Sequence, residues 1–481
     1  HNLDNRGRIY PIAANLSPQG TDYTKALLEF SVGKALSSDD AVNMLALHIS
    51  NEFGNDRDLN AFMGYDLDKS SSLSDRATWA HDLTDKIISV ANDPMGEEHD
   101  FWLKSDHPWC FLRACMEWRD VSRNPEHISL ISLAFDGSCS GMQHLSALFL
   151  DEVGGAKVNL VPDLPRQDVY QDVAETLQAN LTTSANAGVV VVDGADAKAV
   201  EKAELYHERS VNWLASKAID RKLSKTPTMT FLYGVTLGGI ANQIKKAAIK
   251  KGVSEETYDD KRFLATATYK SIKDTCPKAV EGREWLQNLA KAKTDAWADA
   301  FSALGNDDAK DEQVTNQLEA ELKEAAANAT LRWVTPDGFP VVQKYLRTVS
   351  RNVRVTRIDK PNTTVTLTTG SPDIAVSKVV NSIAPNVIHS LDATHIRLVA
   401  SAAKAEGIDN LAMVHDSFGC LAEDAARFFK IVREQFVAQY QGDVAQDLQD
   451  QLGSGAADLP TVPMKGNLDL NAIVNTDFSF A

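Results

Sequence analysis

Two segments of the sequence end an apolar run in an aspartate. In 131–147, ISLAFDGSCSGMQHLSA, the run ends at Asp136 and small residues follow at once. In 411–419, LAMVHDSFG, the run ends at His415 and Asp416. A carboxylate at the end of a buried strand, beside backbone that can approach closely, suits a divalent cation. Two such strands would bring both carboxylates to one pair of Mg²⁺ ions, which activate an attacking hydroxyl and stabilise a leaving oxygen in phosphoryl transfer.

The first of these segments also permits a different reaction. GSCSG fits a G-x-Cys-x-G nucleophile elbow, with Cys139 as an acyl-transfer nucleophile and His415 as its base. An isolated strand-end aspartate such as Asp136 is, in addition, often only a turn or helix-cap residue. The acyl-transfer interpretation gives no reason for Asp136 to precede the elbow, and it leaves the basic segments of the chain unexplained.

A third segment, 221–234 (RKLSKTPTMTFLYG), combines two cations with an aromatic hydroxyl. On a helix Arg221 and Lys225 share a face, and Tyr233 lies about 80° round from Lys225. Two neighbouring cations suit a triphosphate, and a tyrosine can stack on a base while its hydroxyl contacts the sugar. Pro227 allows an alternative arrangement, in which the helix starts at this proline. Lys225 would then precede the helix and Tyr233 would lie within it. The alternative to a site is a basic helix edge with Tyr233 packed in a core.

Charge is unevenly distributed along the 481 residues. The chain has 49 Lys+Arg against 66 Asp+Glu, a formal net charge of −17. Nine basic residues and one acid lie between Arg209 and Lys251, and six basic residues and one acid between Lys344 and Lys360. The negative total argues against a generic polycation that coats nucleic acid, but a local basic surface can still bind phosphates. Both windows could equally be solvated faces.

Composition limits the class of protein. Hydrophobic residues make up 43% and charged residues 24%, which excludes a wholly disordered or collagen-like chain, and the length suggests about three domain-sized units. No stretch approaches the roughly 18 apolar residues of a membrane span, and the N-terminus lacks an apolar signal sequence. Five dispersed cysteines without a C-x-x-C pair argue against a zinc site and a disulfide framework. Because the first residue is His, we expect a processed or truncated chain.

Local patterns predict several elements. Capping residues and helical apolar spacing predict helices at 38–53, 167–181, 306–328, 393–404 and 423–440. In 353–368, VRVTRIDKPNTTVTLT, β-branched and polar residues alternate on both sides of a Lys-Pro-Asn turn. This alternation predicts an extended two-stranded ribbon that carries Arg354 and Arg357.

Taken together, the three motifs resemble a known family. DGSCSGMQHLSA at 136–147, RKLSKTPTMTFLYG at 221–234 and HDSFG at 415–419 are similar to motifs A, B and C of the phage-type single-subunit DNA-directed RNA polymerases, the T-odd phage enzymes and their mitochondrial relatives. Further matches are DNRGRIY at 4–10, DEVGG-x-x-VNL at 151–160, WVTPDGFPV at 333–341, APNVIHSLDATHIR at 384–397 and the terminal DFSFA. The resemblance covers essentially the whole chain.

This resemblance implies an α+β, mostly helical, right-hand polymerase. The palm, with an antiparallel sheet, would comprise about 1–160 and 384–481, the latter also forming a C-terminal foot. The fingers would comprise about 161–383, including a specificity-loop-like ribbon at about 341–375. The family's N-terminal domain and thumb would lie upstream of residue 1. We therefore expect palm plus fingers, as a fragment of a longer polymerase or as a naturally short or split one.

The resemblance also implies roles for single residues. Asp136 and Asp416 would bind two Mg²⁺ ions with the Gly137 carbonyl as a further ligand, and Lys225 would contact the triphosphate and protonate pyrophosphate. The other nucleotide-binding residues would be Arg57, Arg221, Tyr170, Tyr233 and His389, of which the last two select the ribose 2′-OH. Arg8 would lie near the template–product hybrid, and His415 would orient Asp416 or contact the primer end. Arg354 and Arg357 would read promoter DNA in the major groove.

The implied function is template-dependent addition of ribonucleoside triphosphates to an RNA 3′ end. Its partners would be double-stranded promoter DNA, the template strand, nascent RNA, ribonucleotides and a separate or missing N-terminal region, with no membrane. The cytoplasm of a phage-infected host is favoured over a mitochondrion. Two alternatives stay open: a related family A-like DNA polymerase, and a DNA-binding polymerase fragment that is inactive by itself. Tyr233 with His389 favours RNA synthesis.

Overall fold

The computed structural model describes residues 1–13, 15–54, 64, 71–190, 196–258, 261–304, 320, 329–355, 363–454, 456 and 458–480. Two residues singled out in the sequence, Arg57 and Arg357, lie outside these described residues, as does nearly all of the helix predicted at 306–328. The expectations for them therefore stay predictions.

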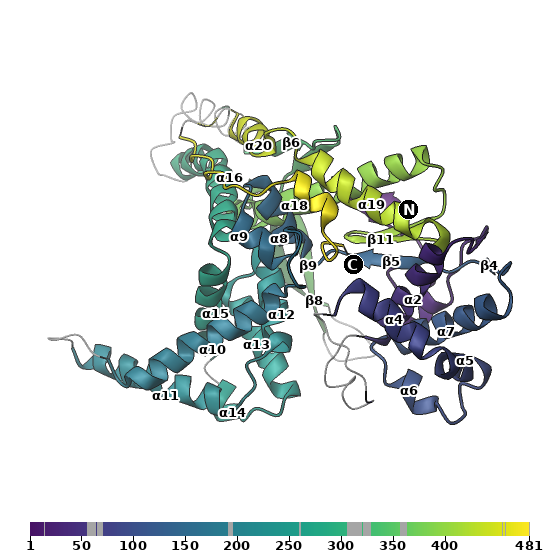
Figure 1. Ribbon diagram of the computed structural model, residues 1–481. Helices are drawn as coiled ribbons and strands as arrows, with labels where there is room; N and C mark the ends of the chain where they lie inside the picture. Colours follow the sequence, from purple (N-terminus) through teal and green to yellow (C-terminus); the bar gives the residue numbers. More distant parts are fainter. Residues whose placement is uncertain are drawn as a thin grey trace.

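Helices make up most of the described chain (Figure 1). In the first half they are α1 (Asp22–Ala26), α2 (Asp39–Phe53), α4 (Leu73–Asp82), α5 (Thr84–Asn92), α6 (His99–Leu103), α7 (Pro108–Arg123), α8 (Ser140–Leu148), α9 (Glu152–Lys157), α10 (Val169–Ala187), α11 (Ala197–Ala215) and α12 (Arg221–Leu232). The later ones are α13 (Leu237–Lys250), α14 (Glu255–Tyr258), α15 (Lys261–Thr275), α16 (Pro277–Leu304), α18 (Val376–Ala405), α19 (Ala422–Gln439), α20 (Val444–Gly453) and the 3₁₀ helix η1 (Asn471–Asn475).

The strands are short and pair only in antiparallel fashion among the described residues. The central sheet has the order β10-β11-β5, with β10 at Leu411–Val414, β11 at Ser417–Cys420 and β5 at Leu133–Asp136. The other strands form pairs: β1 (Asn2–Leu3) with β2 (Ile9–Tyr10), β3 (Lys34–Ala35) with β4 (Ile128–Ser129), β6 (Leu331–Val334) with β7 (Pro340–Gln343), and β8 (Leu346–Val355) with β9 (Thr363–Ile374). The expected mostly helical α+β class is confirmed.

Helix starts follow the capping residues in the sequence. Ser38 caps α2 by accepting a hydrogen bond from the backbone of Ala41, and Asp168 caps α10 through two backbone N–H groups. Both predicted helices are therefore confirmed. The helix predicted at 393–404 is only the C-terminal part of α18, which begins at Val376 and runs through Pro385.

Two hydrophobic cores organise the molecule. The main core includes β5, β11, α2, α8, α16, α18 and α19, while a smaller one gathers side chains of α10–α13 and α15, among them Trp213, Leu223 and Ile244. Figure 1 shows α10–α15 on one side of the molecule and α2 with α4–α7 on the other. In the described chain, no helix has the combination of length and apolarity that a membrane span requires.

Candidate active site

Strand pairing brings the two motif aspartates to the same end of the central sheet. Asp136 is the last residue of β5 and lies opposite Ser417, the first residue of β11. Asp416 directly precedes Ser417 in the two-residue turn between β10 and β11, and its carbonyl oxygen accepts a hydrogen bond of 3.1 Å from the backbone N–H of Gly137. Alternation along β5 buries Phe135 against Phe429 of α19 and leaves Asp136 exposed on the opposite face. The prediction that two strand ends converge is confirmed.

The donor set at this sheet end fits a magnesium site. Burial and the charge of Asp136 raise the pKa of the Asp416 carboxyl. A cation between the two carboxylates would offset their repulsion and favour the ionised form of Asp416. The described residues contain no group of three or more His, Cys, Asp or Glu side chains placed to hold a metal ion. Two carboxylates suffice for Mg²⁺, which usually keeps several waters and takes its other ligands from substrate phosphates.

Helix α12 carries the two motif cations on one face. Its N-cap is Asp220, so the helix starts before Lys225, and the proposed start at Pro227 is wrong. Pro227 lies inside the helix, where the packing of α12 against α10 and α13 offsets the hydrogen bond that proline cannot donate. Arg221 therefore stays one turn from Lys225.

Tyr170, near the start of α10, lies beneath both cations. The guanidinium carbon of Arg221 is 5.4 Å and the Nζ of Lys225 is 5.9 Å from the centre of its ring. Its hydroxyl is hydrogen-bonded to Cys139, and burial raises the pKa of both groups. Arg221 also forms an ion pair through Nε with Asp168, whereas Lys225 is exposed. The ring is thus a platform under two cationic groups.

Tyr233, the C-cap of α12, lies beside His389 of α18. Their ring centres are 4.7 Å apart with an interplanar angle of 47°. The close approach of the two helices depends on Gly234, which has φ 76° and where a side chain would collide with the carbonyl oxygen of Asn381. The Tyr233 hydroxyl faces Gly141 at the start of α8, 3.5 Å from the position of an added Cβ. Motif B therefore meets motif A at this tyrosine.

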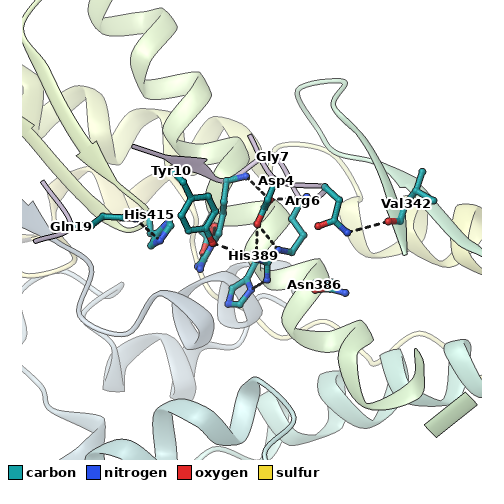
Figure 2. A network of polar contacts seen from close by, with 12 residues as sticks. Asp4, Arg6, Gly7, Tyr10, Gln19, Val342, Asn386, His389 and His415 are labelled. Carbon is teal, nitrogen blue, oxygen red and sulfur yellow. Dashed lines mark hydrogen bonds and ion pairs between the residues drawn. The ribbon is translucent and has the colours of Figure 1, made fainter. Parts of the chain in front are cut away.

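The turn between β1 and β2 binds the same face of α18 (Figure 2). Arg6 Nη1 lies 2.8 Å from His389 Nδ1, and Arg6 is itself held by Asp4 through Nε at 2.9 Å. Arg8 forms two hydrogen bonds with the buried carboxylate of Asp392, one turn further along α18. Burial, with the charges of Arg8 and Arg6, lowers the pKa of His389 to about 2, so this histidine is neutral.

His415 occupies the turn before Asp416 with φ 56°. Its ring packs edge-on against Tyr10 at 5.0 Å, and its Nε2 lies 3.0 Å from Gln19 Nε2, as Figure 2 shows. Burial and nearby Arg8 lower the pKa of His415 to about 4. These contacts hold a neutral His415 next to Asp416 without a direct bond between the two side chains among the described contacts.

The acyl-transfer interpretation of Cys139 is wrong. Its side chain is buried, and burial raises the pKa of the thiol, which opposes formation of a nucleophilic thiolate. Its hydrogen-bond partner is Tyr170, and among the described contacts His415 bonds Gln19 instead. Cys139 is a packing residue under the cation platform.

The predicted ribbon exists as the long hairpin β8–β9. Arg354 lies opposite Thr364 on it and is exposed. The hairpin extends away from the end of α18 between the two groups of helices in Figure 1. Arg354 thus lies on a hairpin distinct from the strand, turn and helix that carry Asp136, Asp416, Arg221 and Lys225.

The sequence alone does not single out several residues of this site. Arg6, Tyr10, Gln19 and Asp392 position the predicted residues, but they lie far from them in the sequence. Arg6 and Tyr10 lie in DNRGRIY and Asp392 lies in APNVIHSLDATHIR, two segments that resemble the family, but neither segment alone indicates which residues these side chains contact.

Comparison with known proteins assigns the family. A family model described as DNA-dependent RNA polymerase matches residues 36–459. The chain belongs to this family. All of it aligns with T7 RNA polymerase of Escherichia phage T7 at 32% identity over 508 residues, covering 53% of that protein. It aligns with the DNA-directed RNA polymerase of Enterobacteria phage K11 at 31% identity, covering 51%, and with the mitochondrial DNA-directed RNA polymerase 1B of Nicotiana tabacum at 30%, covering 42%.

These similarities confirm the resemblance to the phage-type polymerases. The chain spans about half the length of the curated relatives it matches. Identity near 30% over the whole chain supports the fold and the family, and the activity of this chain is a separate question.

Proposed function

We propose that this chain is the palm-and-fingers part of a DNA-directed RNA polymerase and extends an RNA 3′ end on a DNA template with ribonucleoside triphosphates. The observation that carries the proposal is the register of the central sheet, which joins Asp136 and Asp416 at one end. Phosphoryl transfer needs positioning and charge neutralisation more than covalent chemistry, and two carboxylates facing a pair of cations meet that need.

Asp136 and Asp416, with the Gly137 carbonyl, would hold two Mg²⁺ ions. When bound, these ions supply activation of the attacking 3′-hydroxyl and stabilisation of the leaving oxygen. The convergence of the two carboxylates at one sheet end, with the pKa of Asp416 raised by burial and by the charge of Asp136, supports this assignment.

The cations of α12 would bind the incoming triphosphate. Lys225 is exposed and makes no ion pair with a residue that the structure describes, so its ammonium can reach a phosphate and donate a proton to pyrophosphate. Arg221 keeps both terminal Nη groups for phosphate because only its Nε bonds Asp168. Arg57 would add a third contact, from outside the described residues.

Tyr233 and His389 would select ribonucleotides over deoxyribonucleotides. Both present a polar atom at the junction of motifs A and B, and a deoxyribonucleotide would leave such an atom unpaired. Arg8, which bonds Asp392 of α18, and His415, in the turn before Asp416, would contact the hybrid and the primer end. Tyr170 would act through the two cations above its ring.

The remaining assignments follow the same proposal. The palm would comprise 1–160 and 384–481 and the fingers 161–383, with β8–β9 reading promoter DNA. Template DNA, promoter DNA and nascent RNA would be its macromolecular partners. The phage relatives make the cytoplasm of an infected cell the expected compartment.

Primer extension tests the proposal directly. An RNA primer annealed to a DNA template is incubated with the full chain, Mg²⁺ and either four rNTPs or four dNTPs, and products are resolved by length. We expect extension with rNTPs and little with dNTPs. Extension with dNTPs alone would identify a DNA polymerase, and scaffold binding without extension at any Mg²⁺ concentration would identify an inactive fragment.

Two conservative substitutions locate the reaction. Asp136→Asn and Asp416→Asn keep side-chain volume but remove the charge, and each should abolish extension while scaffold binding persists. Asp443→Asn is a matched control, because Asp443 caps α20 far along the chain and pairs with Lys465. Extension by either active-site variant would contradict the metal assignment.

A further inference from the structure

A polar pocket lies beside motif A. It encloses about 160 Å³, and its lining includes Ser138 and three basic residues, Lys157, Arg166 and Arg221. Ordered water needs only about 10–15 Å³ measured in this way, so the space accommodates a small polyatomic ion. Ser138 belongs to motif A and Arg221 to motif B, whereas Arg166 lies outside the three motifs.

Of the three basic residues, Arg166 has the environment that most strongly indicates an anionic ligand. Its side chain is half-buried, and it forms no hydrogen bond or ion pair with another residue in the ranges that the structure describes. Burial lowers the pKa of its guanidinium, Asp168 opposes that change and Arg221 adds to it. A guanidinium that is partly desolvated and lacks a partner gains strongly from an anion.

The other two cations retain donors for the same ligand. Arg221 uses Nε for Asp168, and Lys157 uses one of its three protons for Asp172 at 2.7 Å. The acids that line the pocket do not cancel the charge of Arg166. Asp168 is already paired with Arg221 and caps α10, and Asp106 is exposed to water.

The loop that carries Arg166 is fixed to motif A. Asn159 accepts a 2.7 Å hydrogen bond from the backbone N–H of Gln167 and donates to the carbonyl oxygen of the same residue. Its amide also donates at 2.8 Å to the hydroxyl of Ser138, two residues after Asp136. Arg166 is therefore held at a defined place next to the reaction centre rather than on a free surface.

We propose that Arg166 is a further phosphate-binding residue, and that its pocket takes a pyrophosphate group with Arg221 and Lys157. Given the proposed polymerase function, this group is either the departing product or the terminal phosphates of the nucleotide. Two linked phosphates match several cations arranged round one cavity, because each phosphate offers oxygens to more than one donor.

Direct binding of inorganic pyrophosphate tests the site without catalysis. Calorimetric titration of the full chain, with no divalent metal added, compares wild type with Arg166→Gln, Arg166→Lys and a control. The control is Lys404→Gln, which removes one positive charge from an exposed side chain of α18. We expect Arg166→Gln to weaken pyrophosphate binding about tenfold or more, Arg166→Lys to weaken it less, and the control to leave it unchanged. Equal affinity of all four proteins would overturn the proposal.

Kinetic measurements separate the two sources of the ligand. In primer extension, a higher KM for rNTP in Arg166→Gln indicates that the pocket holds the terminal phosphates of the nucleotide. An unchanged KM, with slower pyrophosphorolysis and weaker inhibition by added pyrophosphate, indicates the released product. Arg166→Gln that extends primers with wild-type KM, inhibition and pyrophosphorolysis would overturn the inference and leave the polymerase function standing. Loss of pyrophosphate binding in Arg166→Gln, in a chain that extends no primer, would contradict only the polymerase function.

Discussion

Arg6 Nη1 donates a hydrogen bond to His389 Nδ1 across 2.8 Å, although the two residues are 383 positions apart in the sequence. Arginine has no acceptor, so Nδ1 must be the unprotonated nitrogen of the ring. With the pKa of His389 at about 2, the ring is neutral, and its one proton is on Nε2. Arg6 thus fixes the tautomer in which His389 presents a donor beside Tyr233.

Removing Arg6 should relax sugar selection. In Arg6→Ala the ring can take either tautomer, and Nε2 no longer consistently offers a proton to a ribose 2′-oxygen. Loss of one such hydrogen bond costs about 0.5–1.5 kcal/mol, so we expect the ratio of kcat/KM for ATP over dATP to fall about three- to tenfold. Arg6→Lys, which also donates only, should keep part of the selectivity.

Because Arg6→Ala also removes a positive charge, the loss of charge needs a separate control. Lys404→Gln should leave the ATP/dATP ratio unchanged, and His389→Ala should lower it at least as far as Arg6→Ala. If His389→Ala lowered the ratio and Arg6→Ala did not, the tautomer would not depend on Arg6. Steady-state primer extension with single nucleotides measures all four proteins.

Tyr170 should matter for its ring and not for its hydroxyl. The hydroxyl bonds the buried thiol of Cys139, whereas the ring faces Arg221 and Lys225. Cation–π contacts contribute about 0.5–2 kcal/mol, so Tyr170→Leu should raise the KM for rNTP about three- to tenfold. Tyr170→Phe is the matched control and should stay within about twofold of wild type. A larger effect of Tyr170→Phe on the ATP/dATP ratio would instead indicate direct contact with the sugar.

Elements with a strong local signal could be predicted from the sequence. Ser38 begins α2, and the apolar run before Asp136 forms β5, because capping and alternation act within a few residues. Two apolar runs that each end in an aspartate indicated that Asp136 and Asp416 converge, but the antiparallel pairing of β11 with β5 is what sets their register.

Contacts between distant segments could not be predicted in this way. Neither the pairing of Arg6 with His389 nor that of Arg8 with Asp392 has a local pattern, since each depends on how the β1–β2 turn packs on α18. Pro227 shows the opposite limit, because the local cost of a proline in a helix is outweighed by the tertiary packing of α12. The reacting groups of the site could thus be predicted from local sequence patterns, whereas the groups that orient them are brought there by tertiary packing.

The buried histidine His395 should make stability depend on pH. Its Nε2 donates to the carbonyl oxygen of Val432 at 2.7 Å, and burial lowers its pKa to about 4. Between about pH 6.5 and that value the unfolded chain binds a proton that the folded chain does not, so this residue's contribution to stability falls as pH falls. The loss is about 1.4 kcal/mol per pH unit.

A variant isolates this contribution from those of other titrating groups. His395→Gln keeps a donor but does not titrate, so its stability relative to wild type should improve by about 1.4 kcal/mol on going from pH 6 to pH 5. Denaturant unfolding at the two pH values measures the difference. Stability curves that run parallel for both proteins would show that His395 does not carry the pH dependence.

The two faces of the β8–β9 hairpin should have different effects on DNA binding. Side chains alternate along β8, so Arg354 shares a face with Asn352, which accepts a 2.8 Å hydrogen bond from Thr366. Arg351 lies on the other face, with the exposed apolar side chains of Val349 and Val353. We expect the polar face to pair with base edges, and we expect Arg351, on the apolar face, to contribute mainly through its charge.

Selection of bound duplexes from a random-sequence library distinguishes these effects. Arg354→Ala should change or broaden the recovered sequence, because a bidentate arginine–guanine contact discriminates by about 1–3 kcal/mol. Arg351→Ala is matched in charge and should recover the same sequence with uniformly weaker binding. If both variants recovered the wild-type sequence, the polar face would not read bases. If Arg351→Ala alone changed it, the apolar face would be the one that enters the groove.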